Sequence, residues 1–486
     1  MTELATIVTA LDGRGLLAAP FTDSLQITGV TEDSRKVEAG TLFCAIDGTA
    51  TDGHAFLGDA ADQGAAAALV TRPVHALLPQ VVVRESRLAA GVAAREFYDN
   101  PASGMTLIGV TGTNGKSTTV SIIRHLLNTG QSASSLGTLG AIDGSGETLS
   151  GYVSLTTPGP VEFQAVLAEL RARGVTHVAC EASSHGLDQG RLHSATFAAA
   201  VYTNLTHEHL DYHHDLESYA AAKMKLSALV APGGVEVVNA DDATWDALPE
   251  RGDIRRSRYG RAQDADVRAV RERSIDSGTS CTFCFGNEEH RVELPLLGDY
   301  NVANALAAAA VVWGLGVDPA LVVARLSDVP QVSGRMEQLW SGGFTVLRDY
   351  AHTPDGFERA IATIKSITPG RLVVLFGCGG DRDRDKRAVM ASITARLADL
   401  VVITDDNPRT EDPKQILDDI EKGLGQVERL RIPDREKGIH QAVYLLQPGD
   451  CLLLLGKGHE TYQIYGTEKM PFDERAIVQT AVRQSV

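Results

Sequence analysis

The chain has 486 residues, of which 45 are basic and 62 acidic, giving a formal net charge of −17. This balance argues against nucleic acid as the main partner, because no broad basic surface is expected, although a small site can still gather cations around an anionic substrate. No apolar run approaches the roughly 20 residues of a membrane helix, so no membrane span is expected. The N-terminus lacks the basic and apolar regions of a signal peptide, and we expect a cytoplasmic protein of about three domains.

Residues 1–97 are predicted to form a small α/β domain. The strand-like runs are LQITGV, TLFCAI, AAALVT and QVVVR, and a helix is expected at SRLAAGVAAREFYD. Two polar loops lie between these elements, one around Asp33, Ser34 and Arg35 and the other at residues 47–56. On pattern alone, each loop is either a ligand contact or an ordinary solvated turn.

Residues 98–330 begin with a strand and a glycine-rich loop, IGVTGTNGKSTT. Gly112 and Gly115 allow backbone N–H groups to turn toward a phosphate, and the following helix N-terminus adds positive potential. Lys116 can neutralise the β- and γ-phosphates, and the Ser117 hydroxyl can bind Mg²⁺. The general P-loop pattern would have glycine where Val110 stands, which leaves an ordinary glycine-rich turn as the alternative. The Gly-Lys-Ser-Thr ending favours nucleotide binding.

The strands and helices that follow alternate, which predicts a mostly parallel, doubly wound sheet with its ligands beyond the carboxyl ends of the strands. Glu181 ends one such strand and is a candidate Mg²⁺ ligand. The run TNLTHEHLDYHH is rich in histidine and acidic residues, but its spacing matches no zinc pattern, so magnesium is favoured over zinc. Lys223 and Lys225 lie on an amphipathic helix, where they are either functional or merely solvated. Asn301 and Asn304 lie at the start of an alanine-rich helix, where they either cap the helix or hydrogen-bond the edge of an adenine.

Residues 331–486 are again predicted to be α/β. The strands RLVVLFGCG, ADLVVITDD and DCLLLLG are each followed by a polar loop, namely GGDRDRDKR, DDNPRTEDP and GKGHE. Three strand-end loops of this kind indicate one site. The cations that could bind carboxylate groups there are Arg382, Arg384, Lys386, Arg387 and Arg409. Six cysteines, including a C-x-x-C pair in a strand-like run at Cys281 and Cys284, are expected to be buried thiols.

The motifs TGTNGKSTT, TTP, EASSHGLDQGR, TNLTHEHLDYH, GRME, DYAHTPD, DNPR and GKGHE occur in this order along the chain. They resemble the UDP-N-acetylmuramoyl-tripeptide synthetases of the Mur ligase family over essentially the whole length. The resemblance implies three domains: a small α/β domain for the UDP end at residues 1–97, a central P-loop domain with a doubly wound parallel sheet for ATP at 98–330, and a Rossmann-like α/β domain for the amino acid at 331–486.

The same resemblance implies an ATP-dependent amide ligase of cytoplasmic peptidoglycan precursor synthesis. It would use Mg²⁺ and an acyl-phosphate intermediate to add meso-diaminopimelate to UDP-N-acetylmuramoyl-L-alanyl-D-glutamate. The residues implied to contact the UDP-substrate are Ser34, Thr49, Ala50, Thr51, Thr156, Thr157, Ser183, Gln189 and Arg191. Those implied for ATP are Gly112, Thr113, Asn114, Gly115, Lys116, Ser117, Thr118, Asn301, Asn304, Arg335, Asp349 and His352.

The implied catalytic residues are Lys116, Glu181, His209 and Lys223. Metal ligation is implied for Ser117, Glu181, His209 and Lys223, the last as an N6-carboxylysine carbamate. A neutral lysine amine that adds carbon dioxide becomes an anion suited to Mg²⁺, whereas a protonated lysine would repel the ion. Lys225 is the neighbouring competitor for this role. Most family members have aspartate where this chain has Glu208, and little change is expected because both residues are acidic.

Diaminopimelate contacts are implied for Arg382, Asp406, Asn407, Pro408, Arg409, Gly456 and Glu460. In this family Asp-Asn-Pro-Arg accompanies diaminopimelate rather than lysine. The physical reason is that diaminopimelate carries a second carboxylate, which calls for Arg409 and Asn407, while Glu460 would face its distal ammonium. Arg382 would bind the carboxylate next to the attacking amine. The rival interpretations are a lysine-adding ligase, a folyl-polyglutamate synthase and a nucleotide-binding regulatory protein without catalysis.

Overall fold

The computed structural model describes residues 2–48, 51–75, 77–152, 155–275 and 278–485. The chain divides into two compact units. The first comprises Met1–Arg268, Cys284–Glu288 and Asn304–Arg325, and the second comprises Ala269–Phe283, Glu289–Ala303 and Leu326–Val486. Each unit is described by itself below.

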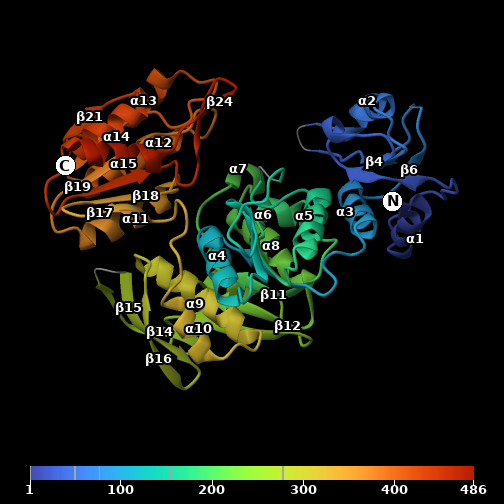
Figure 1. The fold of residues 1–486 in the computed structure, drawn as a ribbon, viewed down its shortest axis with the longest axis horizontal. Helices are drawn as coiled ribbons and strands as arrows, with labels where there is room; N and C mark the ends of the chain where they lie inside the picture. Colours follow the sequence, from blue (N-terminus) through green and yellow to red (C-terminus); the bar gives the residue numbers. More distant parts are fainter. Residues whose placement is uncertain (1, 49–50, 76, 153–154, 276–277, 486) are drawn as a thin grey trace. The chain divides into compact units, whose positions relative to one another are not determined.

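The N-terminal part of the first unit, drawn in blue in Figure 1, has a parallel sheet in the order β3-β4-β5-β6. Alternate side chains of β4 face opposite sides, since Leu42 packs with the residues of α1 and α3 and Phe43 packs with those of α2. The elements are β1 (Thr2–Glu3), α1 (Leu4–Gly13), β2 (Gln26–Ile27), β3 (Gly29–Thr31), η1 (Ser34–Lys36), β4 (Thr41–Cys44), η2 (Gly53–Phe56), α2 (Leu57–Asp62), β5 (Ala67–Val70), β6 (Gln80–Val82) and α3 (Ser86–Phe97).

The central part of the first unit has a sheet whose strands run β13-β12-β11-β7-β10-β8-β9. All neighbouring pairs are parallel except β8 and β9, which form an antiparallel pair at the edge. The elements are β7 (Thr106–Thr111), α4 (Lys116–Leu127), β8 (Ala133–Gly137), β9 (Gly140–Ile142), α5 (Pro160–Ala172), β10 (His177–Glu181), α6 (Ser184–Asp188), β11 (Phe197–Tyr202), α7 (Leu210–His213), α8 (Leu216–Met224), η3 (Lys225–Leu229), β12 (Val230–Asn239), η4 (Ala243–Ala247) and β13 (Arg255–Gly260).

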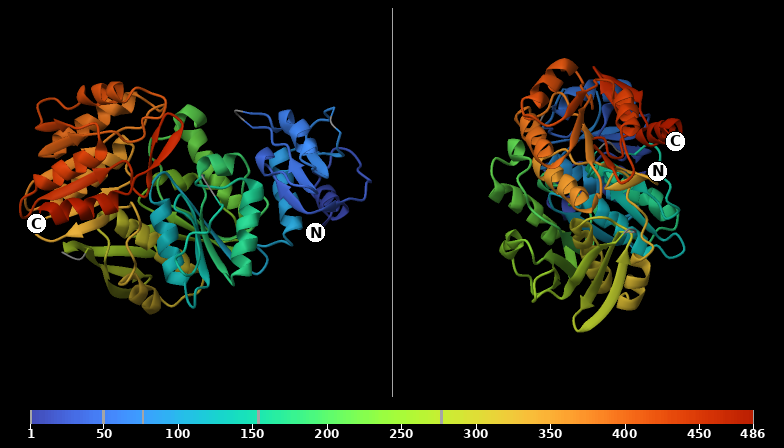
Figure 2. Two further views of the ribbon diagram at one scale, coloured as in Figure 1. Left: turned by 45° about the horizontal axis from the view of Figure 1, so that its top comes forward. Right: turned by 90° about the vertical axis from the view of Figure 1, so that its left-hand side faces the viewer.

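Helices cover both faces of this central sheet. Helix α5 packs Phe163 and Leu167 against Val178 and Cys180 of β10, while α4 lies on the opposite side of the strands (Figure 2). A doubly wound sheet of this kind leaves its ligand groups at the carboxyl ends of the strands. Strands β7, β10 and β11 end side by side, at Thr111, Glu181 and Tyr202, so the loops that follow them converge.

Several elements lie at the junctions of the two units in sequence. They are β14 (Val267–Ile275), β15 (Gly278–Phe285), β16 (Glu288–Leu294), α9 (Asp299–Gly314) and α10 (Pro319–Leu326). Strand β15 carries Cys281 and Cys284, as the sequence predicted. All six cysteines are free thiols and are buried, and burial raises the pKa of each of Cys180, Cys378 and Cys451 to about 12.

The second unit contains a sheet in the order β17-β18-β22-β19-β20-β21, parallel except for the β17–β18 pair. Alternate residues of β19 face opposite layers: Val374 and Phe376 pack with α11, α12 and α13, and Val373 and Leu375 pack with α14 and α15. The elements are β17 (Glu337–Ser341), β18 (Thr345–Asp349), α11 (Pro354–Ile367), β19 (Leu372–Phe376), α12 (Asp385–Leu397), β20 (Leu400–Ile403), α13 (Pro413–Glu421), β21 (Arg429–Arg431), α14 (Arg435–Tyr444), β22 (Cys451–Leu455), β23 (Tyr462–Tyr465), β24 (Glu468–Pro471) and α15 (Glu474–Ser485).

The predicted fold class is confirmed: both units are α/β, the central sheet is mostly parallel and the C-terminal sheet is layered on both faces. The amphipathic helix predicted to carry both Lys223 and Lys225 ends between them, since α8 ends at Met224 and the chain continues as a 3-10 helix to Leu229. The sequence reading did not find helix α1 or the β23–β24 hairpin. Among the described residues, none of the helices is both long and apolar enough to cross a bilayer.

Candidate active site

The loop between β7 and α4 can be built only with glycine at two positions. Gly112 has a φ of 144°, and a Cβ placed on it would lie 1.9 Å from Thr203 Oγ1. Gly115 has a φ of 87°, and a Cβ there would lie 2.2 Å from Asn304 Oδ1. At both positions the backbone is left-handed and a neighbouring side chain lies too close for a Cβ, so the loop requires glycine. Asn304 thus lies against the loop, where the sequence predicted it.

The carboxyl end of β11 fixes the shape of this loop. Asn204 accepts a hydrogen bond from Thr113 N through its backbone oxygen (2.7 Å) and one from Asn114 N through Oδ1 (3.0 Å). Thr203 Oγ1 donates to Asn114 O at 2.7 Å. The loop is therefore held by the residues that follow the neighbouring strand.

Lys116 folds back over the loop, since its Nζ donates to Gly112 O (2.9 Å) and to Thr113 O (2.8 Å). Ser117 and Thr118 follow in the first turn of α4, and both are buried. A cation, two hydroxyl-bearing residues and a helix N-terminus are the groups that bind a polyphosphate in such loops.

Lys223 and Lys225, which the sequence left as competitors, have opposite environments. Lys223 is 1% exposed, and its Nζ donates to Gly112 O at 2.7 Å and lies 4.3 Å from the centre of the Tyr219 ring. Burial, and then the positive charge of Lys116, lower the pKa of Lys223 well below its ordinary value. Lys225 instead pairs with Asp188 at 2.7 Å on the surface. Lys223 is therefore the lysine whose protonation is opposed by burial beside the loop.

Glu181 lies at the end of β10 and is 2% exposed. Its Oε1 accepts from Thr138 N at 2.8 Å and its Oε2 accepts from Thr138 Oγ1 at 3.2 Å. The carboxylate of Glu181 and the hydroxyl of Ser117 are oxygen donors of the kind that Mg²⁺ takes as ligands. Thr138, which orients Glu181, was not found from the sequence.

His209 begins α7 with a left-handed backbone (φ 57°), and its ring lies edge-on to His185 with 4.9 Å between ring centres. Burial lowers the pKa of His209, the negative charge of Glu208 opposes this, and the positive charge of Lys116 lowers the pKa further. A neutral imidazole is the form that can ligate a metal. Glu208 lies 3.8 Å from His209 Nε2.

The residues predicted to contact the muramoyl-dipeptide gather around the end of β10. Thr157 Oγ1 donates to Glu181 O at 2.8 Å and lies 2.9 Å from Ser183 Oγ. Arg191 donates to Thr157 O at 2.7 Å and to Gln189 Oε1 at 2.7 and 3.1 Å. Thr156 Oγ1 lies 3.1 Å from Thr138 Oγ1, in the same cluster.

A cavity of about 540 Å³ opens beside this cluster, between the N-terminal and central parts of the first unit. Arg191 lines it together with Arg87, Glu32 and Glu162. Arg87 also donates to Gln189 Oε1 at 3.2 Å, so it joins the cluster, and the sequence reading did not find it. Burial, reinforced by the charge of Glu162, raises the pKa of Glu32 to about 7, and Arg191 opposes that rise.

The N-terminal loops are pinned by their own polar networks. Ser34 begins the 3-10 helix η1, which is capped by Asp33. In the second loop, buried His54 lies 2.7 Å from Asp52 through Nδ1 and accepts from Thr71 N at 3.1 Å through Nε2. Thr51 is exposed. The predicted contacts at Thr49 and Ala50 fall outside the described residues.

In the second unit, Arg335, Asp349 and His352 lie around the end of β18. Asp349 accepts from Met336 N and Ala351 N, both at 2.7 Å, and burial raises its pKa. The guanidinium of Arg335 stacks on the Tyr350 ring at 4.7 Å, and His352 lies against the same ring, with 4.9 Å between ring centres. Asn301, also predicted for the adenosine side, donates to Leu297 O at 2.8 Å in this unit.

The predicted amino-acid pocket brings together the loops after β20 and β22. Asn407 Nδ2 donates to Glu460 Oε2 at 2.8 Å, so the two residues predicted for the distal end of the amino acid are in direct contact. The Asp406 carboxylate lies close to Gly456, where a Cβ would be 3.1 Å from Asp406 Oδ2. Lys457, which the sequence reading did not single out, is buried among them.

Arg409 is held in a left-handed backbone (φ 54°) by the β23–β24 hairpin. Its N–H donates to Ile464 O at 3.0 Å, and Gly466 N donates to Arg409 O at 2.7 Å. One terminal nitrogen of its side chain donates to Gly380 O at 2.9 Å. The hairpin therefore aims the Arg409 side chain at the loop after β19, where Arg382 lies exposed.

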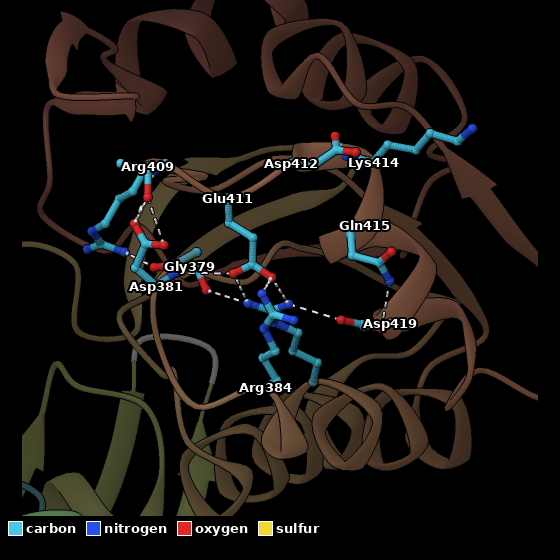
Figure 3. A network of polar contacts seen from close by, with 12 residues as sticks. Gly379, Asp381, Arg384, Arg409, Glu411, Asp412, Lys414, Gln415 and Asp419 are labelled. Atoms are coloured by element: carbon cyan, nitrogen blue, oxygen red, sulfur yellow. Dashed lines mark hydrogen bonds and ion pairs between the residues drawn. The ribbon is translucent and has the colours of Figure 1, made fainter.

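Two of the cations predicted to be available for carboxylates are already paired within the protein. Figure 3 shows Arg384 directed at Glu411, and the ion-pair distance is 2.9 Å. Arg387 is fully buried and pairs with Glu411 (2.7 Å) and Asp419 (3.0 Å). These contacts join the loop after β19 to the loop that carries Pro408 and Arg409. Arg387 thus organises the pocket walls instead of facing a ligand.

Three family models match the chain: the Mur ligase family catalytic domain at residues 26–98, the Mur ligase middle domain at 110–312 and the Mur ligase glutamate ligase domain at 334–458. A protein of Geobacillus kaustophilus, named UDP-N-acetylmuramoyl-L-alanyl-D-glutamate–2,6-diaminopimelate ligase, is 40% identical over 94% of this chain and 95% of its own length. The chain belongs to the Mur ligase family.

Solved structures agree with this assignment. This Mur ligase superposes with a TM-score of 0.68 on a UDP-N-acetylmuramoyl-L-alanyl-D-glutamate–2,6-diaminopimelate ligase, at 32% identity over 94% of this chain and 95% of the other. It also shares its fold with the MurF ligase of Thermotoga maritima in complex with ADP, with a TM-score of 0.67, 19% identity and coverage of 94% and 97%. The three-part order of the family models matches the predicted three-domain fold, while the exact boundaries stay a prediction.

Proposed function

We propose that this Mur ligase joins meso-diaminopimelate to UDP-N-acetylmuramoyl-L-alanyl-D-glutamate with ATP as co-substrate, in cytoplasmic peptidoglycan precursor synthesis. The names of relatives at about 40% identity support the reaction. The observation that carries the choice of amino acid is the clustering of Asn407, Glu460 and Arg409. An arginine and an amide suit the extra carboxylate of diaminopimelate, and the glutamate suits its distal ammonium.

In the proposed reaction, the γ-carboxylate of the D-glutamyl residue attacks the γ-phosphorus of ATP. An acyl phosphate forms and ADP leaves. The α-amine of diaminopimelate then attacks the acyl carbon, and a tetrahedral intermediate collapses to the amide with release of phosphate and a proton. Lys116 and the backbone N–H groups of its loop position the phosphates and offset the charge that develops on them.

The oxygen donors beside the loop fit Mg²⁺, which would be held by Ser117, Glu181, His209 and the carbamate of Lys223. The carbamate forms when the neutral Lys223 amine adds carbon dioxide and loses a proton. The ion supplies charge neutralisation on the phosphate oxygens when bound. The chain's own contribution is to hold Glu181 through Thr138 and to oppose protonation of the Lys223 amine by burying it.

Substrate contacts in this proposal follow the clusters described above. The UDP-dipeptide is held by Ser34, the loop containing Thr51 and the Thr157, Ser183, Gln189 and Arg191 cluster. Diaminopimelate is held through Arg382 at the carboxylate next to the attacking amine, and through residues 406–409 with Gly456 and Glu460 at its distal end.

The test is a turnover assay with purified protein, ATP, Mg²⁺ and the UDP-dipeptide, in which phosphate release and product mass are measured with diaminopimelate and with lysine. Amide formation with diaminopimelate and little with lysine is expected. Equal use of lysine would overturn the choice of amino acid, and no product with either would overturn the ligase proposal. Arg409→Ala should lower kcat/KM for diaminopimelate far more than it changes the KM for ATP. Lys116→Ala should abolish phosphate release.

A further inference from the structure

Lys457 lies in the loop after β22 and is 0% exposed. Its Nζ donates to Asn407 Oδ1 (2.6 Å), to Tyr462 O (2.6 Å) and to Glu460 Oε2 (3.2 Å), and it lies 3.2 Å from Asp406 Oδ1. An ammonium group has three protons to donate, and all three are accounted for by these acceptors. The lysine is therefore an internal cation of the pocket and not a group that reaches toward solvent.

This arrangement fixes which way the Asn407 amide points. Its Oδ1 accepts from both Lys457 Nζ and Ile464 N, the latter at 3.0 Å. Its Nδ2 is consequently turned to Glu460, to which it donates at 2.8 Å. A flipped amide would place its N–H₂ group against two donors and its oxygen against a carboxylate, which costs several hydrogen bonds in a buried site.

Lys457 also sets the charge of the pocket. Two carboxylates, Asp406 and Glu460, lie against its ammonium within 3.2 Å. With Lys457 present, the three groups carry one net negative charge; without it they carry two. A doubly negative wall attracts an amino acid that ends in an ammonium alone and repels one that also carries a carboxylate.

We propose that Lys457 is a positioning residue that sets the choice of amino acid: it holds Asn407 and Glu460 in the orientation that receives the distal end of diaminopimelate, and its charge allows a second carboxylate to enter. This inference rests on the proposed function. Lys457 itself is covered by Asn407, Glu460 and Tyr462, and acts through them rather than on the reacting atoms.

A purely structural role predicts a different outcome. If Lys457 only stabilised the packing of the loops after β20 and β22, its loss would lower the melting temperature and reduce turnover with every amino acid alike. If it selects the amino acid, the ratio of kcat/KM for diaminopimelate to kcat/KM for lysine changes. The KM values for ATP and the UDP-dipeptide report whether the rest of the site is intact.

The test uses the full chain with Lys457→Met, which removes the charge and the donors at similar length. Lys437→Met is the matched control, because Lys437 is an exposed lysine of α14 in the same unit. We expect the KM for diaminopimelate to rise tenfold or more and the diaminopimelate-to-lysine ratio to fall tenfold or more, with the other two KM values within twofold. A change in the ratio below threefold, or equal losses for all substrates, would overturn the proposal.

Two further variants keep the test decisive if Lys457→Met does not fold. Lys457→Gln keeps a hydrogen-bond donor without the charge, so the ratio should fall in the same direction. Asn407→Asp leaves Lys457 in place but removes the hydrogen-bond donor to Glu460 and adds a carboxylate, so it should likewise lower the ratio. An unchanged ratio in either variant that folds counts against the proposal. The wild-type reaction separates the two claims, because failure of the wild type to form the diaminopimelate amide refutes the proposed function, whereas a wild-type product with an unchanged ratio in the variants refutes only the role of Lys457.

Discussion

Lys223 Nζ donates a 2.7 Å hydrogen bond to the carbonyl oxygen of Gly112, the first glycine of the phosphate loop. A protonated lysine at this buried position would face the charge of Lys116, and the pKa of Lys223 is accordingly lowered. The same burial favours the neutral amine, which is the form that is a nucleophile toward carbon dioxide. The position therefore suits a modified lysine, and Lys225 does not share this environment.

Lys223→Met should reduce kcat on the order of 10²-fold or more, because a group placed next to the phosphate loop is lost. Lys225→Met is the control and should retain most activity, since Lys225 pairs with Asp188 at the surface. Carbon-13 NMR of protein in labelled bicarbonate should show a carbamate signal that Lys223→Met lacks and Lys225→Met retains. A signal that persists in Lys223→Met would contradict the assignment.

Thr138→Val should weaken the response to magnesium. Thr138 Oγ1 donates to Glu181, and loss of a group that orients a metal ligand commonly costs about 10- to 100-fold in metal affinity. The Mg²⁺ concentration that gives half-maximal turnover should rise by that order, while activity at saturating Mg²⁺ partly recovers. Thr176→Val, at the exposed start of the β10 region, is the control. An unchanged magnesium dependence in Thr138→Val would remove Glu181 from the metal site.

Glu32→Gln should stabilise the protein at neutral and alkaline pH. Burial raises the pKa of Glu32 from 4.5 to about 7, so the unfolded chain releases this proton at lower pH than the folded chain. The wild type should thus lose stability as pH rises from about 4.5 to about 7, by at most about 3 kcal/mol, and the glutamine variant should not. Melting temperatures of the two proteins should diverge between pH 5 and pH 8. Glu250→Gln, an exposed substitution, should show no such divergence, and parallel curves for Glu32→Gln would refute the shift.

Arg387→Met should destabilise the second unit strongly. Arg387 is fully buried with Glu411 and Asp419, and removing one partner from a buried ion pair leaves uncompensated charge at a cost of about 3–5 kcal/mol. The free energy of unfolding measured with urea should fall by this amount. Arg396→Met breaks only the exposed pair with Glu358, whose value is about 0–1 kcal/mol. Similar losses in the two variants would mean that the buried network is not a stabilising unit.

The sequence predicted what depends on neighbours along the chain. A strand that leads into Gly112, Gly115 and Lys116 defines the phosphate loop within a few residues, and alternation of strands and helices defines the sheets. What it could not predict depends on contacts between distant residues. Thr138 hydrogen-bonds to Glu181, which is 43 positions away in the sequence, and Lys457 hydrogen-bonds to Asn407, which is 50 positions away.

The sequence also could not show which cationic side chains are already paired within the protein. The sequence presented Arg384 and Arg387 as cations like Arg382 and Arg409, because composition does not say which cations are already paired. Only the fold shows that Glu411 accepts from Arg387, 24 positions away, and so withdraws it from any ligand. The β23–β24 hairpin escaped detection for a related reason: its strands are four residues each, and their importance lies in fixing the backbone of Arg409.

The six buried thiols have a practical consequence for experiments on this protein. Reagents such as maleimides react with the thiolate form of an accessible sulfur, and here burial blocks access to all six sulfurs and opposes the ionisation of Cys180 and Cys378. The native chain should therefore behave toward such reagents as though it had no cysteine. A single cysteine introduced at an exposed position would take a fluorophore or spin label selectively, without prior removal of the natural ones.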